Sequence, residues 1–586
     1  MADTPSTPQR IQLALVVVAL VLLVVWYVWP SLSQGELLGA PQTDIIRAVW
    51  GLDHAWESLP TPPFWTGRMA FPVGVKIVLL PQFSMILGAP LVGLFGPVLG
   101  FNIWVVSLWA AAGLGSAFLA WRITDSPAAA LLAGTMMLIQ PMLFLALSDG
   151  TPEFVAWWAV PTALGALYSA GRLHGSHPTA HRGWALAAGG LLGVVALDSP
   201  YHAIFCAPFV PLVFEWRRWQ RQGPMVLSLL AFGLLLLGLY WGIPLTAPES
   251  NAPGNSITLE VWKRWETRRT LGHWDYTLGT GFIPWRVLVA LLACAALRWK
   301  KALPWVCIGV LALAWGLGTH PENTPMLQTW LGRPGLWLGE GVIWFNTHFP
   351  PPIVRFPRRW LVPAAQAVAI AGAIGVAALP REWMRWLLVV PFCIAAVHHT
   401  ETLTEFRANL PHFSPPSPAF TQFVAGSGER GAVLFLPRFR GARETEDRSQ
   451  LPVFADISPN IRSADELWFQ VLCHRASTYW PDGLRTVVRR NAFAPDTDRV
   501  LHALDDIANP QTIGEPIPAQ ATDEPERRRR VAATLVEQGL GFVAIDEKIY
   551  TTIGVDLIRT AFADVTVTDQ HFDDGTGVTV LVLGKR

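Results

Sequence analysis

The chain has 586 residues, of which 52% are hydrophobic and 15% are charged, and its formal net charge is +1. Soluble domains carry about 25% charged residues, so this composition excludes an ordinary soluble protein and indicates a polytopic membrane protein with a more polar tail. The near-neutral charge does not suggest nucleic acid as a partner.

The first predicted membrane span is followed by a helix that begins next to a carboxylate. The run 11–29 is predominantly apolar and long enough for one membrane helix, which needs about 20 residues. It ends in aromatic residues rather than at a cleavage site, so we interpret it as a retained anchor. In segment 45–57, apolar residues recur at helical spacing, which predicts an amphipathic helix in the membrane interface. Asp44 precedes this helix, where it acts either as an N-cap or as a reacting group.

The orientation of the chain depends on whether the run 77–97, which Pro81, Pro90 and Pro97 interrupt, crosses the membrane. If it does not cross, the short loops rich in Arg and Lys lie on one face, and the short loops 148–153 and 198–202 on the other face have none. We therefore expect run 77–97 to be re-entrant or interfacial, with the N-terminus in the cytoplasm and the tail outside the inner (plasma) membrane. This gives about eleven membrane helices, at 11–29, 99–121, 127–147, 154–171, 184–198, 203–215, 225–245, 282–297, 303–318, 360–379 and 385–398.

Several ionisable residues in the predicted outer loops are candidates for a chemical role. Asp149 and Glu153 flank a Gly-Thr-Pro turn, where a carboxylate also complements the dipole of the following helix. Asp198 fits an N-cap of the next helix, and His202 fits an interfacial side chain or a substrate-binding group. Other candidates are His273 and Asp275, which could line an acceptor groove, and Arg355, Arg358 and Arg359, which either anchor the chain at lipid headgroups or bind phosphate.

The tail has the pattern of a soluble α/β domain. We expect a transmembrane domain over 1–399 with interfacial helices in the first outer loop (30–98), a proline-rich linker over 400–430, and an extracytoplasmic α/β domain over 431–586. Predicted strands in this domain are 431–437, 541–545, 565–568 and 579–583, with a hairpin turn at 573–577. Predicted helices are 465–474 and 527–539.

The order of these features resembles the GT-C superfamily of integral-membrane glycosyltransferases, in its mostly uncharacterised bacterial branch. The similarity lies in Asp44 with the Trp-rich helix behind it, in the turn Phe71-Pro72-Val73-Gly74, and in Ser199-Pro200-Tyr201-His202 at the start of a span. It also includes Arg355-Phe356-Pro357-Arg358-Arg359-Trp360 before a late span, and an extracytoplasmic tail domain. The resemblance implies a GT-C-like membrane fold.

The resemblance further implies transfer of a hexosyl or pentosyl group from a polyprenyl-phosphate carrier to a glycan, lipid or protein acceptor on the outer face. Asp44 would act as the base, and Asp149 and Glu153 would hold the acceptor or a divalent metal such as Mg²⁺ or Mn²⁺. Arg355, Arg358 and Arg359 would bind the carrier phosphate. Membrane lipids would surround the bundle.

Two departures from the branch pattern leave other functions open. No second acidic residue adjoins Asp44, and Asp149-Gly150 stands where the branch often has Gly-His. The first alternative is therefore a non-catalytic GT-C-fold protein that binds a lipid-linked glycan or scaffolds envelope proteins. A transporter or flippase is a weaker alternative, because the chain shows no internal repeat and no charge well inside a span.

Overall fold

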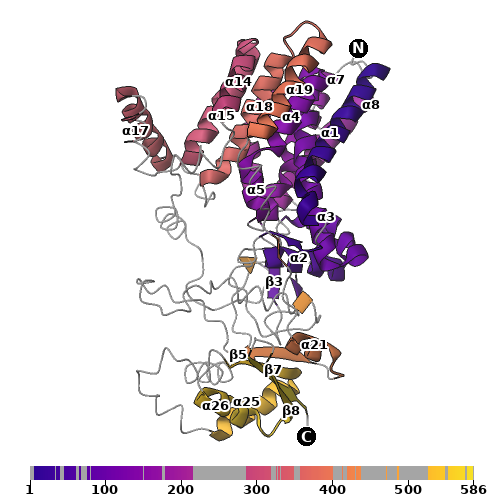
Figure 1. Cartoon of the computed structure of the whole chain (residues 1–586), viewed down its shortest axis with the longest axis vertical. Helices are drawn as coiled ribbons and strands as arrows, with labels where there is room; N and C mark the ends of the chain where they lie inside the picture. Colours follow the sequence, from indigo (N-terminus) through magenta and orange to yellow (C-terminus); the bar gives the residue numbers. More distant parts are fainter. Residues whose placement is uncertain are drawn as a thin grey trace.

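The computed structural model describes a helical bundle and a tail with a four-stranded sheet, which lie at opposite ends of the molecule, with α2 and β3 between them (Figure 1). The described residues are 6–32, 35–39, 45–60, 65–66, 75–78, 81–148, 151–173, 178–214, 285–317, 325, 328–329, 332–348, 357–399, 412–413, 419–428, 431–436, 470–471, 485–486, 525–547, 552–573 and 577–584.

Within the described ranges, three helices of the bundle are long and apolar enough to cross a membrane, over Thr7–Pro30, Phe83–Thr124 and Thr179–Asp198. The chain is therefore an integral membrane protein. The total of about eleven crossings stays a prediction, and the run 225–245 lies outside the described residues. The bundle helices are α1 (Thr7–Leu32), α3 (Gln82–Thr124), α4 (Pro127–Leu138), α5 (Pro141–Ser148), α6 (Pro152–Val155), η1 (Ala156–Trp158), α7 (Ala159–Leu173), α8 (Pro178–Asp198), α9 (Pro200–Cys206), α10 (Val210–Val213), α14 (Trp285–Ala296), α15 (Trp299–Leu317), α17 (Arg333–His348), η4 (Pro357–Trp360), α18 (Leu361–Val376) and α19 (Glu382–His399).

One predicted span is divided in the structure. The run 127–147 forms two helices, α4 and α5, because Pro141 cannot continue the backbone hydrogen bonds of α4. Gln140 lies at this break with no exposed surface. Its Nε2 donates to the Leu361 carbonyl oxygen at 3.2 Å, so the break is anchored to α18.

The ambiguous run 77–97 is not a separate membrane helix. Its first residues belong to strand β3 (Val75–Val78), and the rest forms the first limb of α3, which bends at Gly96 (φ 78°, ψ 170°). This backbone conformation favours glycine, which has no Cβ. The 43 residues of α3 would measure about 65 Å as a straight helix, whereas a membrane core is about 30 Å thick. The helix is therefore longer than one straight crossing needs, and the bend divides it into two limbs.

The helix predicted after Asp44 is α2 (Ile45–Ser58), and its surroundings differ from the expectation. We expected one apolar face in the membrane interface, but ten of the first eleven residues of the helix are buried, including Asp53 and His54, and Arg47 is half-buried. The tail contacts the helix at Trp50, whose Nε1 donates to Gln470 Oε1 at 2.9 Å.

The tail sheet has the strand order β5-β7-β9-β8, in which β5 and β7 are parallel and the other pairs are antiparallel. Helix α21 packs its aromatic residues against this sheet, as in the Phe423–Phe572 pair. It lies within the segment 400–430, which its prolines had led us to predict as a linker. Only residues 470 and 471 of the predicted helix 465–474 lie within the described part of the chain. The elements are β5 (Ala432–Leu436), β7 (Leu540–Asp546), β8 (Thr566–Phe572), β9 (Val578–Leu583), α21 (Ala419–Gly426), α25 (Pro525–Glu537) and α26 (Thr552–Phe562).

Short strands join the tail to the first predicted outer loop. Strand β1 (Leu37–Leu38) pairs with β4 (His412–Phe413), and β3 pairs with β6 (Arg485–Thr486) on one side and β2 (Trp65–Thr66) on the other. Backbone pairing requires direct contact, so the loop and the tail lie at the same end of the bundle, which we call the tail end.

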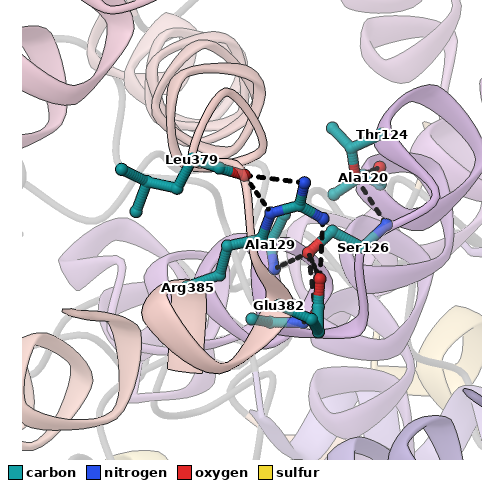
Figure 2. Close-up of polar contacts among 8 residues, drawn as sticks. Ala120, Thr124, Ser126, Ala129, Leu379, Glu382 and Arg385 are labelled. Carbon is teal, nitrogen blue, oxygen red and sulfur yellow. Dashed lines mark hydrogen bonds and ion pairs between the residues drawn. The ribbon is translucent and has the colours of Figure 1, made fainter. Parts of the chain in front are cut away.

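A polar cluster ties three helices together at the opposite end of the bundle (Figure 2). Ser126 caps α4, and its hydroxyl donates to Glu382 of α19 at 3.0 Å. Arg385 forms an ion pair with Glu382 at 2.6 Å and donates to the Leu379 carbonyl oxygen beyond the end of α18. These groups satisfy one another, so the cluster is structural.

A second polar cluster fixes the start of α3. The N-cap residue of α3 is Pro81, which has no side-chain acceptor for the free backbone N–H groups of the first turn. The buried carboxylate of Asp198 replaces it, accepting from the Ser84 backbone N–H at 2.8 Å and from the Ser84 hydroxyl at 2.6 Å. Asp198 therefore caps α3 rather than the helix that follows it.

Replacement of Asp198 by leucine is expected to lower the free energy of unfolding by about 1–3 kcal/mol, since the buried Ser84 donors would lose their acceptor. Thermal unfolding of the detergent-solubilised protein measures this loss. Asp198→Asn keeps one oxygen acceptor and should have a smaller effect. A leucine variant as stable as the wild type would contradict the capping role.

The pairing of β3 with β6 predicts a specific cross-link between the loop and the tail. Ile77 and Thr486 are register partners, and partners in antiparallel strands lie about 4.5–5.5 Å apart, within the range of a disulfide. The pair Ile77→Cys and Thr486→Cys should form a disulfide on oxidation, detected as a shift in gel mobility. The pair Ile77→Cys and Thr568→Cys on β8 serves as control; equal cross-linking of both pairs would contradict the register.

Candidate functional site

The candidate site lies at the tail end of the bundle. Ser84 belongs to the first turn of α3, directly after the strand that pairs with the tail. Because Asp198 binds Ser84, the end of α8 is held at this position, and the chain continues from it through Ser199 into α9. Tyr201 and His202 on α9 are thereby placed at the tail end.

Aromatic rings enclose the guanidinium group of Arg359. Its central carbon lies 3.9 Å from the ring centroid of Phe154 and 4.8 Å from that of Tyr201. Such cation–π contacts hold a guanidinium in place. The next residue, Trp360, is buried and packs against Phe205 at 4.6 Å and Trp315 at 4.4 Å. Arg359 thus sits on a rigid aromatic base formed by α6, α9, α15 and η4.

His202 lies beside this base with no exposed surface. Its ring contacts the edge of Trp157 at a centroid distance of 5.2 Å and Phe154 at 6.1 Å. Neither ring nitrogen has a hydrogen-bond partner within the described part of the chain. His202 lies past the last residue of the candidate span Thr179–Asp198. Burial, and then the positive charge of Arg359, lower the pKa of His202, so its imidazole is neutral.

The structure brings together elements that hold three of the predicted site residues. Glu153 neighbours Phe154 on α6, and His202 neighbours Tyr201 on α9, while Phe154 and Tyr201 both contact Arg359. The backbone of Arg358 belongs to the same 3₁₀ helix, η4, as Arg359. The predicted site residues outside the described ranges are Asp44, Asp149, His273, Asp275 and Arg355.

Gly39 lies close to Ile45 and Leu147, which are near Asp44 and Asp149 in the sequence. This glycine has a φ of +118°, and an added Cβ would overlap the Ile45 side chain and lie 3.3 Å from the Leu147 carbonyl oxygen. Ile45 directly follows Asp44, and Leu147 lies just before Asp149 in the sequence. The first outer loop and the end of α5 are therefore in contact.

Phe154 and Trp157 are site residues that the sequence analysis did not identify. Both belong to the segment that follows Glu153, and both are buried. Aromatic residues are common at the ends of membrane spans, so their presence alone gave no signal. The one feature of the sequence that could have indicated them is that they closely follow Glu153, a candidate carboxylate in a predicted outer loop.

The described residues contain no group of three or more His, Cys, Asp or Glu side chains that could hold a metal ion. Of the two carboxylates predicted to hold a metal or the acceptor, those of Asp149 and Glu153, Asp149 is outside these residues. The expectation of Mg²⁺ or Mn²⁺ therefore remains a prediction.

Comparison with known proteins gives structural neighbours. No protein-family model and no curated protein matches the sequence. The mycobacterial arabinofuranosyltransferase AftD matches with a TM-score of 0.51 and 15% identity, over 100% of this chain and 42% of AftD, so the chain spans less than half of that protein. The Archaeoglobus fulgidus oligosaccharyltransferase has a TM-score of 0.42 and 12% identity, over 96% of this chain and 72% of that one. ArnT from Cupriavidus metallidurans has a TM-score of 0.40 and 13% identity, over 98% and 99%.

All three neighbours are GT-C glycosyltransferases. Of the three, AftD has a TM-score above 0.5, and its 15% identity indicates a shared fold rather than a shared activity. The predicted resemblance is confirmed at this level: the chain is an integral membrane protein with the GT-C fold.

Proposed function

We propose that the chain is a membrane glycosyltransferase that moves a sugar from a polyprenyl-phosphate carrier to an acceptor on the extracytoplasmic face. The observation that supports this function most directly is the placement of Arg359 beside His202 at the tail end of a GT-C bundle. A cation next to a buried neutral imidazole is suited to binding a phosphate ester. The sugar is a hexose or a pentose.

Arg359 is the candidate group for the carrier phosphate. The rings of Phe154 and Tyr201 lie against its guanidinium group, whereas the N–H donors of a guanidinium lie in its plane, where they bind two phosphate oxygens at once. Negative charge grows on the phosphate as the sugar leaves, and a fixed cation stabilises that charge. The stabilisation is larger in a buried site than in water, because the effective dielectric constant is lower.

His202 contributes without carrying charge. A neutral imidazole has one N–H donor and one nitrogen acceptor, and neither is used by the described residues. A carrier oxygen can accept from the donor, and a sugar hydroxyl can donate to the acceptor. His202 would therefore orient the donor substrate, while Arg359 supplies the positive charge.

Asp44 is the proposed base, and Asp149 and Glu153 would orient the acceptor. The carboxylate of Asp44 would take the proton of the acceptor hydroxyl as the acceptor oxygen bonds to the anomeric carbon. The bond from that carbon to the phosphate oxygen breaks, and the carrier phosphate leaves with the electron pair. The closeness of Ile45 and Leu147 to the same glycine, Gly39, supports this assignment, because the two residues lie near the two aspartates in the sequence.

Asp44→Asn is expected to lower the transfer rate by about 10²–10⁴-fold, since the amide cannot accept the proton. The assay follows labelled sugar from a panel of polyprenyl-phosphate hexoses and pentoses into envelope acceptors. Binding of the carrier should not change, and Glu57→Gln at the exposed end of α2 is the control. Full activity in Asp44→Asn would exclude it as the base. A wild-type protein that binds carriers but transfers no sugar would instead be the non-catalytic binder.

Arg359→Gln is expected to weaken the binding of polyprenyl phosphate by about 10–100-fold, the effect of losing charged hydrogen bonds. Arg359→Lys keeps the charge but not the two-pronged geometry, so it should bind with intermediate affinity. Binding can be measured by native mass spectrometry in detergent. Arg381→Gln, at an exposed position between α18 and α19, is the matched control; equal affinities of the Arg359 and Arg381 variants would contradict the phosphate site.

A further inference from the structure

The tail contacts the first outer loop on both sides of Asp44. Before Asp44, strand β1 pairs with β4, and the Leu38 backbone N–H donates to Asn102 Oδ1 of α3 at 3.0 Å. After Asp44, Trp50 of α2 donates to Gln470 of the tail at 2.9 Å. Asp44 itself lies outside the described residues, between these two anchors.

The Trp50–Gln470 hydrogen bond constrains the rotation and position of α2. Trp50 has no exposed surface, and its ring stacks on His54 at 5.1 Å with an interplanar angle of 11°. A buried indole N–H that loses its acceptor pays its full desolvation cost, so rotation of α2 away from Gln470 is unfavourable. Helix α2 begins at Ile45, the residue directly after Asp44 in the sequence.

We propose that Gln470 is a positioning residue, through which the tail fixes the start of α2, the helix that directly follows Asp44 in the sequence. The membrane bundle contacts the loop through Asn102, and the tail supplies the contact on the other side of the carboxylate. The tail then belongs to the catalytic unit, because it positions α2. The consequence for catalysis rests on the proposed function, whereas the position of α2 does not.

The test compares Trp50→Phe, Gln470→Leu and the double variant in the full-length protein. Amide hydrogen exchange of residues 45–58 reports local opening of α2, and kcat and KM are measured with the carrier panel. The exposed tail residue Gln538 provides the control, Gln538→Leu, which is the same chemical change away from α2. Gln470→Glu keeps an oxygen acceptor and tests for rescue.

Trp50→Phe should speed the exchange of α2 amides by about 2- to 13-fold, the range for one hydrogen bond. Gln470→Leu leaves the buried indole N–H without this acceptor and should speed it by about 5- to 160-fold. The value of kcat should fall while KM for the carrier stays unchanged, and the double variant should be no worse than either single variant. Unchanged α2 exchange in Gln470→Leu, or additive effects in the double variant, would overturn the proposal. If the wild type transfers no sugar, the proposed function fails, and α2 exchange still decides whether Gln470 positions the helix.

Discussion

A carboxylate buried at the start of a helix satisfies backbone donors that water cannot reach, and in this protein Asp198 has that role for α3. The indole N–H groups of Trp104 and Trp158 also converge on Ser84, so α3, α8 and η1 are joined at one point. The chain leaves this point as α9, which carries Tyr201 and His202. The aromatic base under Arg359 therefore depends on a carboxylate that has no part in the proposed chemistry.

Much of the bundle could be predicted from apolar runs, because burial in lipid requires them, but the points where helices bend or break could not. The break before Pro141 lies within a continuous apolar run, and hydropathy does not detect a missing backbone N–H. The bend at Gly96 left the role of run 77–97 ambiguous, since its residues suit either a span or an accessory limb. Helix α2 showed an amphipathic pattern, yet its polar residues Asp53 and His54 are also buried, and its Trp50 binds a tail residue distant in sequence.

The ionisable members of the candidate site could be proposed from the sequence, and its aromatic members could not. Glu153, His202 and Arg359 attracted attention as ionisable residues in predicted outer loops, where few such residues occur. Phe154 and Trp157 resembled the many aromatic residues of a chain that contains 29 Trp and 29 Phe. Their role follows from contacts with His202 and Arg359, and the sequence does not indicate that these distant segments meet.

The pairing of β1 with β4 and of β3 with β6 also bears on how the protein is made. Synthesis and insertion begin at the N-terminus, so residues 37–78 reach the tail's side of the membrane before residues 412–486 exist. Until then these strand edges lack their partners, and exposed edges invite unwanted pairing. The loop can therefore complete its strand pairing only late in translation.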